Sequence, residues 1–239
     1  MPGVELGDIG DKIALSQSDN GWLRFTHCAI PRDQMLMRFA EVASDGTYTP
    51  PDKKEAKLVY ASMLTLRMQF LIFSAGFTSN AATVAVRYSV QRTQFRRQKG
   101  SREERKILDY LAQQCKLAPI VASVWAFFFC YDHVSQAYYK FFEEVNALHS
   151  GKNTSFGKGA FKRLPDLHSS ASALKAWISD LTLEHINTAL HSCGGHGFLE
   201  QSGFAFMFRA TSAYSTMEGD NTVLYQQTAR YLLKCDQNN

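Results

Sequence analysis

The chain has 239 residues, 45% of them hydrophobic, and a formal net charge of +4. This length and composition fit one large or two small globular domains and exclude a disordered chain. The charge is too small to indicate nucleic-acid binding by itself, and the one basic run, Arg92–Arg105, is mixed with Glu103 and Glu104. We therefore expect no nucleic-acid partner, while a phosphate-bearing ligand at this run remains open.

Five widely scattered cysteines, without any CxxC spacing, favour a reducing compartment and predict neither a disulfide framework nor a zinc site. Residues Met1–Gly10 are acidic and glycine-rich, unlike a secretory signal. The longest apolar run, Pro119–Tyr131, is too short to cross a bilayer, so we expect no membrane span. The last residues, Asp236–Asn239, do not form a peroxisomal targeting tripeptide.

Residues 1–50 differ from the rest because glycines and prolines punctuate short apolar stretches. Trp22–Thr26 alternates like a strand, and Ile30–Asp33 reads as a turn leading to a short helix. This segment is too short to form an independent sheet domain. It looks like the tail of one.

From Lys53 onward the apolar positions recur with helical spacing, which predicts a large helical bundle. Ser101 with Glu104 resembles a capping box at the start of the second helix, and Pro119 is expected to kink that helix. The elements expected in this region are helices over 54–98, 101–148, 165–193 and 221–234, a loop over Ser150–Gly159 and an aromatic-rich link over Phe198–Tyr214.

Two patterns that suggest chemistry fail on their spacing. Gly151–Gly159 lacks the residue order of a phosphate loop, because Gly159 stands where Ser or Thr is required and no strand precedes it. His185, His191 and His196 suggest a metal site, but six residues place His185 and His191 on different helix faces, and no carboxylate completes a ligand set. We expect a flexible loop and satisfied or exposed histidines.

Three other stretches carry open alternatives. Glu218 lies in a polar break before the last helix, where Asn221 and Thr222 are plausible N-cap residues, so it reads either as a solvated acid or as a functional carboxylate. Cys193–Phe198 has more glycines than a helix C-cap needs, and such a backbone can approach an adenine or a pyrophosphate. Arg92–Phe95 is either an exposed turn or a guanidinium directed at a diphosphate.

Taken together, these stretches resemble the acyl-CoA oxidase family, within the wider acyl-CoA dehydrogenase superfamily. The most specific pair is Cys193–Phe198 with Glu218–Thr222. The resemblance also covers Asp19–Phe25 with Ile30–Arg32, Arg87–Ser89 with Arg92–Phe95, and Leu164–His168 with Leu174–Ala176. It implies a mainly α fold, with residues 1–50 as the tail of the family's middle β-domain and residues 51–239 as a helical FAD-binding and catalytic domain.

The resemblance also implies a mechanism. Glu218 would remove the α-proton of a fatty acyl-CoA while the β-hydrogen leaves as hydride to FAD, giving a trans-2-enoyl-CoA, and O2 would be reduced to H2O2. The base's own backbone N–H and a flavin hydroxyl would bind the enolate oxygen. The residues expected to contact or border FAD are Arg92, Gln94, Phe95, Gly194, Gly195, Gly197 and Asn221, with the glycines in the partner subunit of a homodimer.

Against the family pattern, this chain corresponds to a member truncated at both ends, and a peroxisomal location follows from the family alone. Two alternatives therefore stay open. One is a catalytically inactive helical protein that acts in dimerisation or interaction. The other is a dehydrogenase that passes its electrons to another flavoprotein.

Overall fold

The computed structural model describes residues 2–16, 18–37, 40–51, 55–97, 99–149 and 154–237. The chain forms two compact units, Met1–Ser62 and Met63–Asn239. Their division lies within the first long helix, α1, which runs from Glu55 to Gln91. The sequence placed the boundary earlier, at residues 50 and 51. The identity of the first segment as the tail of a β-domain stays a prediction.

The N-terminal unit contains two antiparallel strand pairs. In the first pair the side chains of Trp22, Leu23 and Phe25 are largely exposed, and an isolated two-stranded hairpin of this kind is only marginally stable in water. The expected strand and short helix near residues 22 and 32 are both observed. The elements are β1 Val4–Asp8 paired with β2 Gly21–Phe25, the 3-10 helix η1 Arg32–Gln34, and β3 Glu41–Val42 paired with β4 Tyr48–Thr49.

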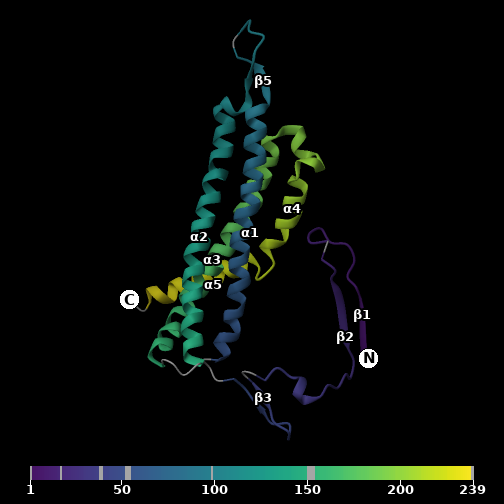
Figure 1. Cartoon of the computed structure of the whole chain (residues 1–239), viewed down its shortest axis with the longest axis vertical. Helices are drawn as coiled ribbons and strands as arrows, with labels where there is room; N and C mark the ends of the chain where they lie inside the picture. The colour runs from purple at the N-terminus through teal and green to yellow at the C-terminus, as the bar shows by residue number, and fades with distance from the viewer. Residues whose placement is uncertain are drawn as a thin grey trace. The chain divides into compact units, whose positions relative to one another are not determined.

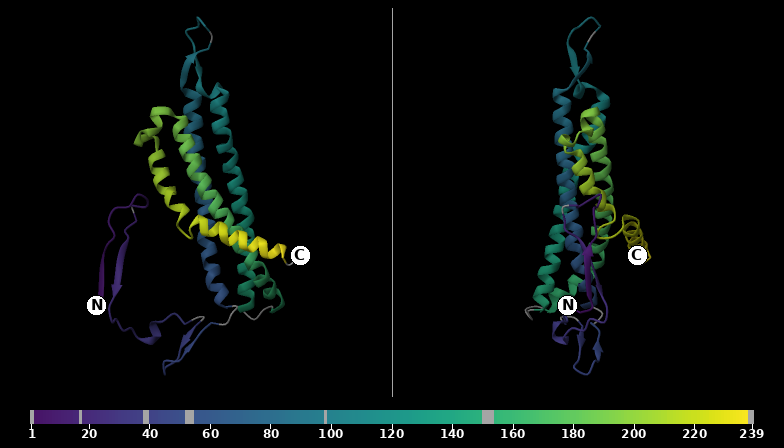
Figure 2. Two further views of the ribbon diagram at one scale, coloured as in Figure 1. Left: turned by 180° about the vertical axis from the view of Figure 1, so that it is seen from behind. Right: turned by 90° about the vertical axis from the view of Figure 1, so that its right-hand side faces the viewer.

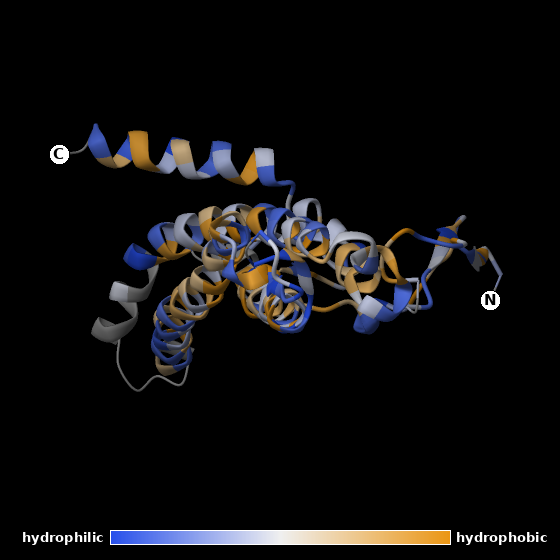
Figure 3. Ribbon diagram, turned by 90° about the horizontal axis from the view of Figure 1, so that it is seen from above, coloured by the Kyte–Doolittle hydropathy of each residue, from blue (hydrophilic) through white to orange (hydrophobic). Residues whose placement is uncertain are grey.

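The second unit is a helical bundle, which confirms the predicted fold class. Its long helices lie side by side in Figures 1 and 2, α4 packs against α3, and α5 crosses the outside of α3. Seen from above in Figure 3, α5 shows alternating hydrophobic and hydrophilic segments, as an amphipathic helix does. After α1 come α2 Leu111–His149, α3 Thr154–Ser192, α4 Phe204–Ser212 and α5 Asn221–Asp236.

The prediction was wrong about the connection between the first two helices. Helix α1 ends at Gln91, and the chain then forms a hairpin of β5 Thr93–Arg96 with β6 Glu104–Lys106. The expected capping box is a local turn instead, because the Ser101 hydroxyl accepts a hydrogen bond from the Glu103 amide and α2 begins only at Leu111. The basic run thus lies largely on an exposed hairpin.

The third helix begins earlier than predicted, at Thr154, so residues 154–159 of the expected loop are helical. Residues 150–153 lie outside the described residues. The helix runs through Pro165, which removes a backbone hydrogen bond and costs about 3 kcal/mol. Leu164 and Leu167 are buried on either side of this proline, and their packing offsets that cost. Pro119 lies inside α2 in the same way.

The main hydrophobic core joins α4 to the C-terminal parts of α1 and α3 and to the N-terminal part of α2. Small residues on α1 let neighbouring helices approach closely, and larger ones from α2, α3 and α4 fill the space between them. The buried members are Ala81, Ala82, Ala85, Leu117, Ile120, Val124, Ile186, Ala189, Cys193, Phe204 and Met207. A second cluster, of Leu71, Ala75, Phe127 and Ile178, lies further along the same helices.

Two segments, Met63–Gln91 and Leu111–Ala147, are long and apolar enough to cross a membrane when judged by length and composition alone. Both supply residues to the buried clusters just described. The apolar windows within them are 44% and 28% buried in the bundle, respectively, and Trp125 and Phe129 of the second are largely exposed. The sequence-based expectation had considered only the shorter run Pro119–Tyr131.

Candidate functional site

The three glycines of the Cys193–Phe198 stretch lie in different local environments. Gly194 follows the end of α3 with a φ of 58°, in the left-handed region that favours glycine at a helix C-terminus. At Gly197 an added Cβ would collide with the carbonyl oxygen of Leu190, whereas at Gly195 it would meet nothing within 4 Å. The C-cap interpretation thus accounts for Gly194, close packing accounts for Gly197, and neither explains Gly195.

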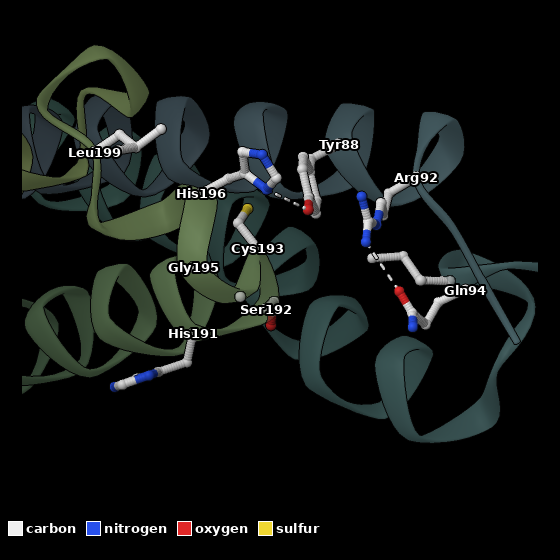
Figure 4. A pocket seen from close by; sticks show the side chains of 11 residues that line it. Tyr88, Arg92, Gln94, His191, Ser192, Cys193, Gly195, His196 and Leu199 are labelled. Carbon is white, nitrogen blue, oxygen red and sulfur yellow. Dashed lines mark hydrogen bonds between the residues drawn. The ribbon is translucent and has the colours of Figure 1, made fainter.

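Gly194 and Gly195 lie on the rim of a pocket of about 580 Å³. In Figure 4, Tyr88, Arg92 and Gln94 lie on one side of this pocket, and the turn after α3 forms the other. The Arg92 guanidinium donates a hydrogen bond to the Gln94 side-chain oxygen at 2.9 Å. The structure therefore brings together four of the predicted cofactor-binding residues, from positions about 100 residues apart in the sequence.

The chemistry of this pocket suits a phosphate-bearing ligand. Arg92 is exposed and carries a planar, permanently charged donor fork, which matches a phosphate group. Gly195 leaves space for close approach to the backbone, and the volume lies in the range of small-molecule sites. Tyr88 and His196 close one wall, since the Tyr88 hydroxyl lies 3.0 Å from His196 Nδ1.

Gln113 bonds to Ser192, which lines this pocket, and the sequence analysis did not identify it. Its side-chain amide donates to the Ser89 hydroxyl at 3.0 Å and to the Ser192 carbonyl at 2.8 Å. It thereby fastens the start of α2 to the ends of α1 and α3. No motif marks this residue, because the contact joins three helices distant in sequence.

Phe95 and Gly197 do not line the pocket. Phe95 is 71% exposed on the hairpin, with a φ of 62°, and Gly197 is buried against α3. Their contact with a cofactor stays a prediction.

The Glu218 turn lies between α4 and α5. Glu218 has a φ of 56° and Gly219 a φ of 113°, so two consecutive residues leave the ordinary right-handed region, which is unfavourable for a residue with a Cβ. The Glu218 side chain is half-buried. Its amide N–H donates to no acceptor within the described part of the chain. The backbone at Glu218 therefore differs from that of an ordinary helix start, and the functional role of its carboxylate stays a prediction.

The N-cap of α5 is Asp220, not Asn221 or Thr222 as predicted. The Asp220 carboxylate accepts hydrogen bonds from the amides of Thr222 and Val223. Aspartate is among the best N-cap residues, because its negative charge also interacts favourably with the positive end of the helix.

Asp220→Ala is expected to lower the free energy of unfolding by about 1 kcal/mol, because two amides at the start of α5 lose their acceptor. Urea denaturation followed by circular dichroism measures the change. Asp220→Asn is the matched control and should retain most of the stability, since asparagine caps equally well. An equal loss in both variants would contradict the cap as the cause.

Asn221 is buried and uses its side chain to fasten α5 to α3. Its Nδ2 group lies 3.1 Å from the Ala176 carbonyl, 2.9 Å from the Ser179 hydroxyl and 2.6 Å from the Asp180 carboxylate. Its Oδ1 accepts from Lys175. The structure thus gives Asn221 a supporting role under the Glu218 turn, and its predicted proximity to the cofactor stays a prediction.

Two buried cations also reach this turn. Arg67 from α1 donates to the Glu218 carbonyl at 3.2 Å, and Lys175 from α3 donates to the Gly219 carbonyl at 2.7 Å. Burial lowers the pKa of Arg67, and the charge of Glu218 opposes that shift. Burial, together with the charge of Arg67, lowers the pKa of Lys175 to about 8, against the charges of Asp180, Asp220 and Glu218.

The pocket and the Glu218 turn lie at different positions along the long axis of the bundle. Along α1, Arg67 contacts the turn and Tyr88 lines the pocket. These positions are 21 residues apart, so their separation along the helix axis is about 30 Å. The predicted site residues therefore form two groups within one chain.

The histidines have partners of their own. His185 Nε2 lies 2.8 Å from the Ser123 hydroxyl, and His168 Nε2 lies 3.1 Å from the Arg67 guanidinium. Burial and the Arg67 charge lower the pKa of His168, so this ring nitrogen accepts from Arg67. Within the described ranges, no three His, Cys, Asp or Glu residues gather as metal ligands.

Comparison with known proteins gives a consistent result. Residues 60–233 match the family model described as acyl-CoA oxidase, C-alpha1 domain. Curated relatives include the mouse peroxisomal acyl-coenzyme A oxidase 1, 38% identical over 238 residues, and its Dictyostelium discoideum counterpart, 36% identical over 233 residues; each match covers 98% of this chain. The chain spans about a third of the length of these relatives, 33% and 32% respectively.

Solved structures match over the same range. Acyl-CoA oxidase 1 from Arabidopsis thaliana aligns with a TM-score of 0.86 at 35% identity, covering 98% of this chain and 34% of that one. Acyl-CoA oxidase-1 of Caenorhabditis elegans, in a structure complexed with FAD and ATP, aligns with a TM-score of 0.83 at 33% identity, covering 98% of this chain and 32% of that one.

Proposed function

Because the chain belongs to the acyl-CoA oxidase family, we propose that it carries the catalytic base and part of the FAD site of an FAD-dependent acyl-CoA oxidase. The reaction is the α,β-dehydrogenation of a fatty acyl-CoA to a trans-2-enoyl-CoA, the first step of fatty acid β-oxidation. The observation that supports this most directly is the family match, which spans both the glycine-rich pocket and the Glu218 turn. The names of the relatives support a peroxisomal location.

Glu218 takes the α-proton in this proposal. A proton beside a thioester is weakly acidic, so the base must be held close to it and partly shielded from water. The half-buried carboxylate meets the second requirement. In this proposal the Glu218 amide N–H, which has no acceptor within the described residues, would donate to the enolate oxygen. FAD, when bound, would supply the hydride acceptor and the route by which O2 is reduced to H2O2.

The residues of the pocket fit the anionic half of FAD. Arg92 supplies charge, Gln94 orients its guanidinium, and Gly194 with Gly195 admits the ligand to the backbone. The C. elegans acyl-CoA oxidase-2 relative, whose structure is described as bound with FAD, ascaroside-CoA and ATP, supports the assignment. Since about 30 Å of helix separates this pocket from the Glu218 turn, we propose a homodimer in which one cofactor contacts Glu218 of one copy and the glycines of the other.

The visible absorption spectrum of the purified chain, titrated with FAD, tests this function. We expect saturable FAD binding, and peroxide release when an acyl-CoA is added. Arg92→Met should weaken FAD binding about tenfold, because a charge-assisted hydrogen bond is lost. Arg97→Met is the matched control, since Arg97 is exposed on the same hairpin outside the pocket. A chain that takes up no FAD would contradict the proposal.

The same assay separates the alternatives. FAD binding without turnover would assign the chain to a non-catalytic, interacting role, an alternative that stays open because the chain spans only a third of its relatives. Turnover with an artificial electron acceptor but without peroxide would indicate a dehydrogenase.

A further inference from the structure

The backbone of the Glu218 turn needs support from its surroundings. Glu218 has a Cβ and yet adopts a φ of 56°, followed by Gly219 at 113°. A non-glycine residue in this region persists only when its neighbours hold it there, and such residues cluster at functional sites. Two consecutive carbonyls in the turn, those of Glu218 and Gly219, accept hydrogen bonds from other helices.

The donors to these carbonyls are buried cations. Arg67 is 5% exposed and Lys175 is 1% exposed. Within the described part of the chain the ion pairs are Arg24–Glu5, Arg163–Glu144 and Arg209–Glu200, so neither cation has a carboxylate partner there. Burying a cation without a direct ion pair is costly. The charge of Glu218 acts on Arg67, and the charges of Asp180, Asp220 and Glu218 act on Lys175, so nearby acids offset part of this cost. A neutral donor would still satisfy a carbonyl at a lower cost.

Each cation is itself fixed in place. The Nη1 atom of Arg67 lies 2.8 Å from the Ser172 hydroxyl and 3.1 Å from His168 Nε2, both on α3. The ammonium of Lys175 also donates to Asn221 Oδ1 at 2.9 Å. Arg67 thus joins α1, α3 and the turn, and Lys175 joins α3, the turn and the start of α5. The carbonyl positions are therefore set by the rigid helices of the bundle.

We propose that Arg67 and Lys175 are positioning residues that hold the consecutive carbonyls of Glu218 and Gly219 and so orient the Glu218 carboxylate for proton removal. This inference rests on the proposed role of Glu218 as the base. Charge-assisted hydrogen bonds to both carbonyls fix the left-handed turn more firmly than neutral donors would. The two positive charges also lie near the Glu218 carboxylate. Burial lowers the pKa of both cations, and the negative charge of Glu218 opposes this shift.

The test compares Lys175→Met, which removes the charge and both hydrogen bonds, with Thr182→Val as a control for a lost polar group in the core of the same helix. Thr182 is buried on α3 and bonds only Thr78 among the described contacts. With FAD bound and octanoyl-CoA or palmitoyl-CoA saturating, we expect the kcat of Lys175→Met to fall about 100-fold, the effect of a small misplacement of a reacting group. KM and FAD affinity should not change.

Arg67→Lys keeps a buried cation and removes the planar fork, so it provides a second variant if Lys175→Met does not fold. It should lower kcat without changing the urea midpoint as much as Lys175→Met does. A wild-type kcat in folded Lys175→Met or Arg67→Lys, or an equal loss in Thr182→Val, would overturn the inference.

Failure of the proposed function is recognised separately. The wild-type chain could bind FAD and yet oxidise neither acyl-CoA. In that case crystal structures of the wild-type chain and Lys175→Met test the inference, and the quantity compared is the φ of residue 218. Loss of the left-handed φ in the variant supports the positioning role. An unchanged φ overturns it.

Discussion

Glu218→Gln is expected to abolish acyl-CoA oxidation while FAD binding and folding stay at the wild-type level. Glutamine has the same shape as glutamate but does not accept the α-proton, and general-base catalysis typically contributes about 10²–10⁴-fold. The backbone of the turn should be retained, because Arg67 and Lys175 hold its carbonyls and not the carboxylate. Peroxide release under saturating acyl-CoA, with a parallel FAD titration, measures both effects.

The control for this substitution is Glu143→Gln, which neutralises an exposed acid on α2, far along the chain from the turn. It should turn over like the wild-type chain. If Glu218→Gln retained turnover, another group would have to be the base. Glu218 would then have a structural role and no catalytic one.

The fold class was predictable because long, periodic apolar segments determine a helical bundle largely by themselves. The end of α2 was predicted at residue 148 and lies at His149, and the last helix begins at Asn221 as predicted. Each of these boundaries coincides with a change in polarity that the sequence displays directly. Which helices pair, and which residues form the buried clusters, was not predicted from this periodicity.

The errors in the helices have a common cause, since in each a tertiary contact outweighs a local signal. Thr93–Arg96 continues a helical pattern, but it pairs with Glu104–Lys106 in a hairpin. Pro165 signals a helix start, but buried leucines on either side keep it inside α3. At α5, Asp220 caps the helix because Asn221 is already engaged by α3.

For the candidate site, the sequence singled out residues that the structure gathers around one pocket, but it did not identify the residues that support them. Arg92, Gln94, Gly194 and Gly195 were identified and lie around one pocket. The φ of Glu218 and the cations that reach it were not predictable, because Arg67 lies 151 residues before it in the chain. Nor did the sequence alone show that Glu218 and the glycine-rich pocket lie at different heights of the bundle. Long-range contacts of this kind leave no local pattern.

Gly197→Ala is expected to be strongly destabilising, by about 3 kcal/mol, because the new methyl group would overlap the Leu190 carbonyl oxygen and neither backbone segment can move freely. Gly197 is buried in the 3-10 turn Gly194–Phe198 that follows α3, so the strain should displace this turn, which also carries Gly194 and Gly195. Urea or thermal denaturation measures the loss of stability. FAD titration should show weakened binding in whatever fraction of the variant remains folded.

Gly195→Ala is the matched substitution two residues away, and it separates packing from ligand contact. The added methyl group meets nothing within 4 Å in the chain itself, so the free energy of unfolding should stay near the wild-type value. If a nucleotide occupies the open side of the pocket, the same methyl group intrudes on it, and FAD affinity should fall by about tenfold or more. Unchanged FAD affinity in Gly195→Ala would place the ligand elsewhere, because a nucleotide in the pocket would meet the added methyl group.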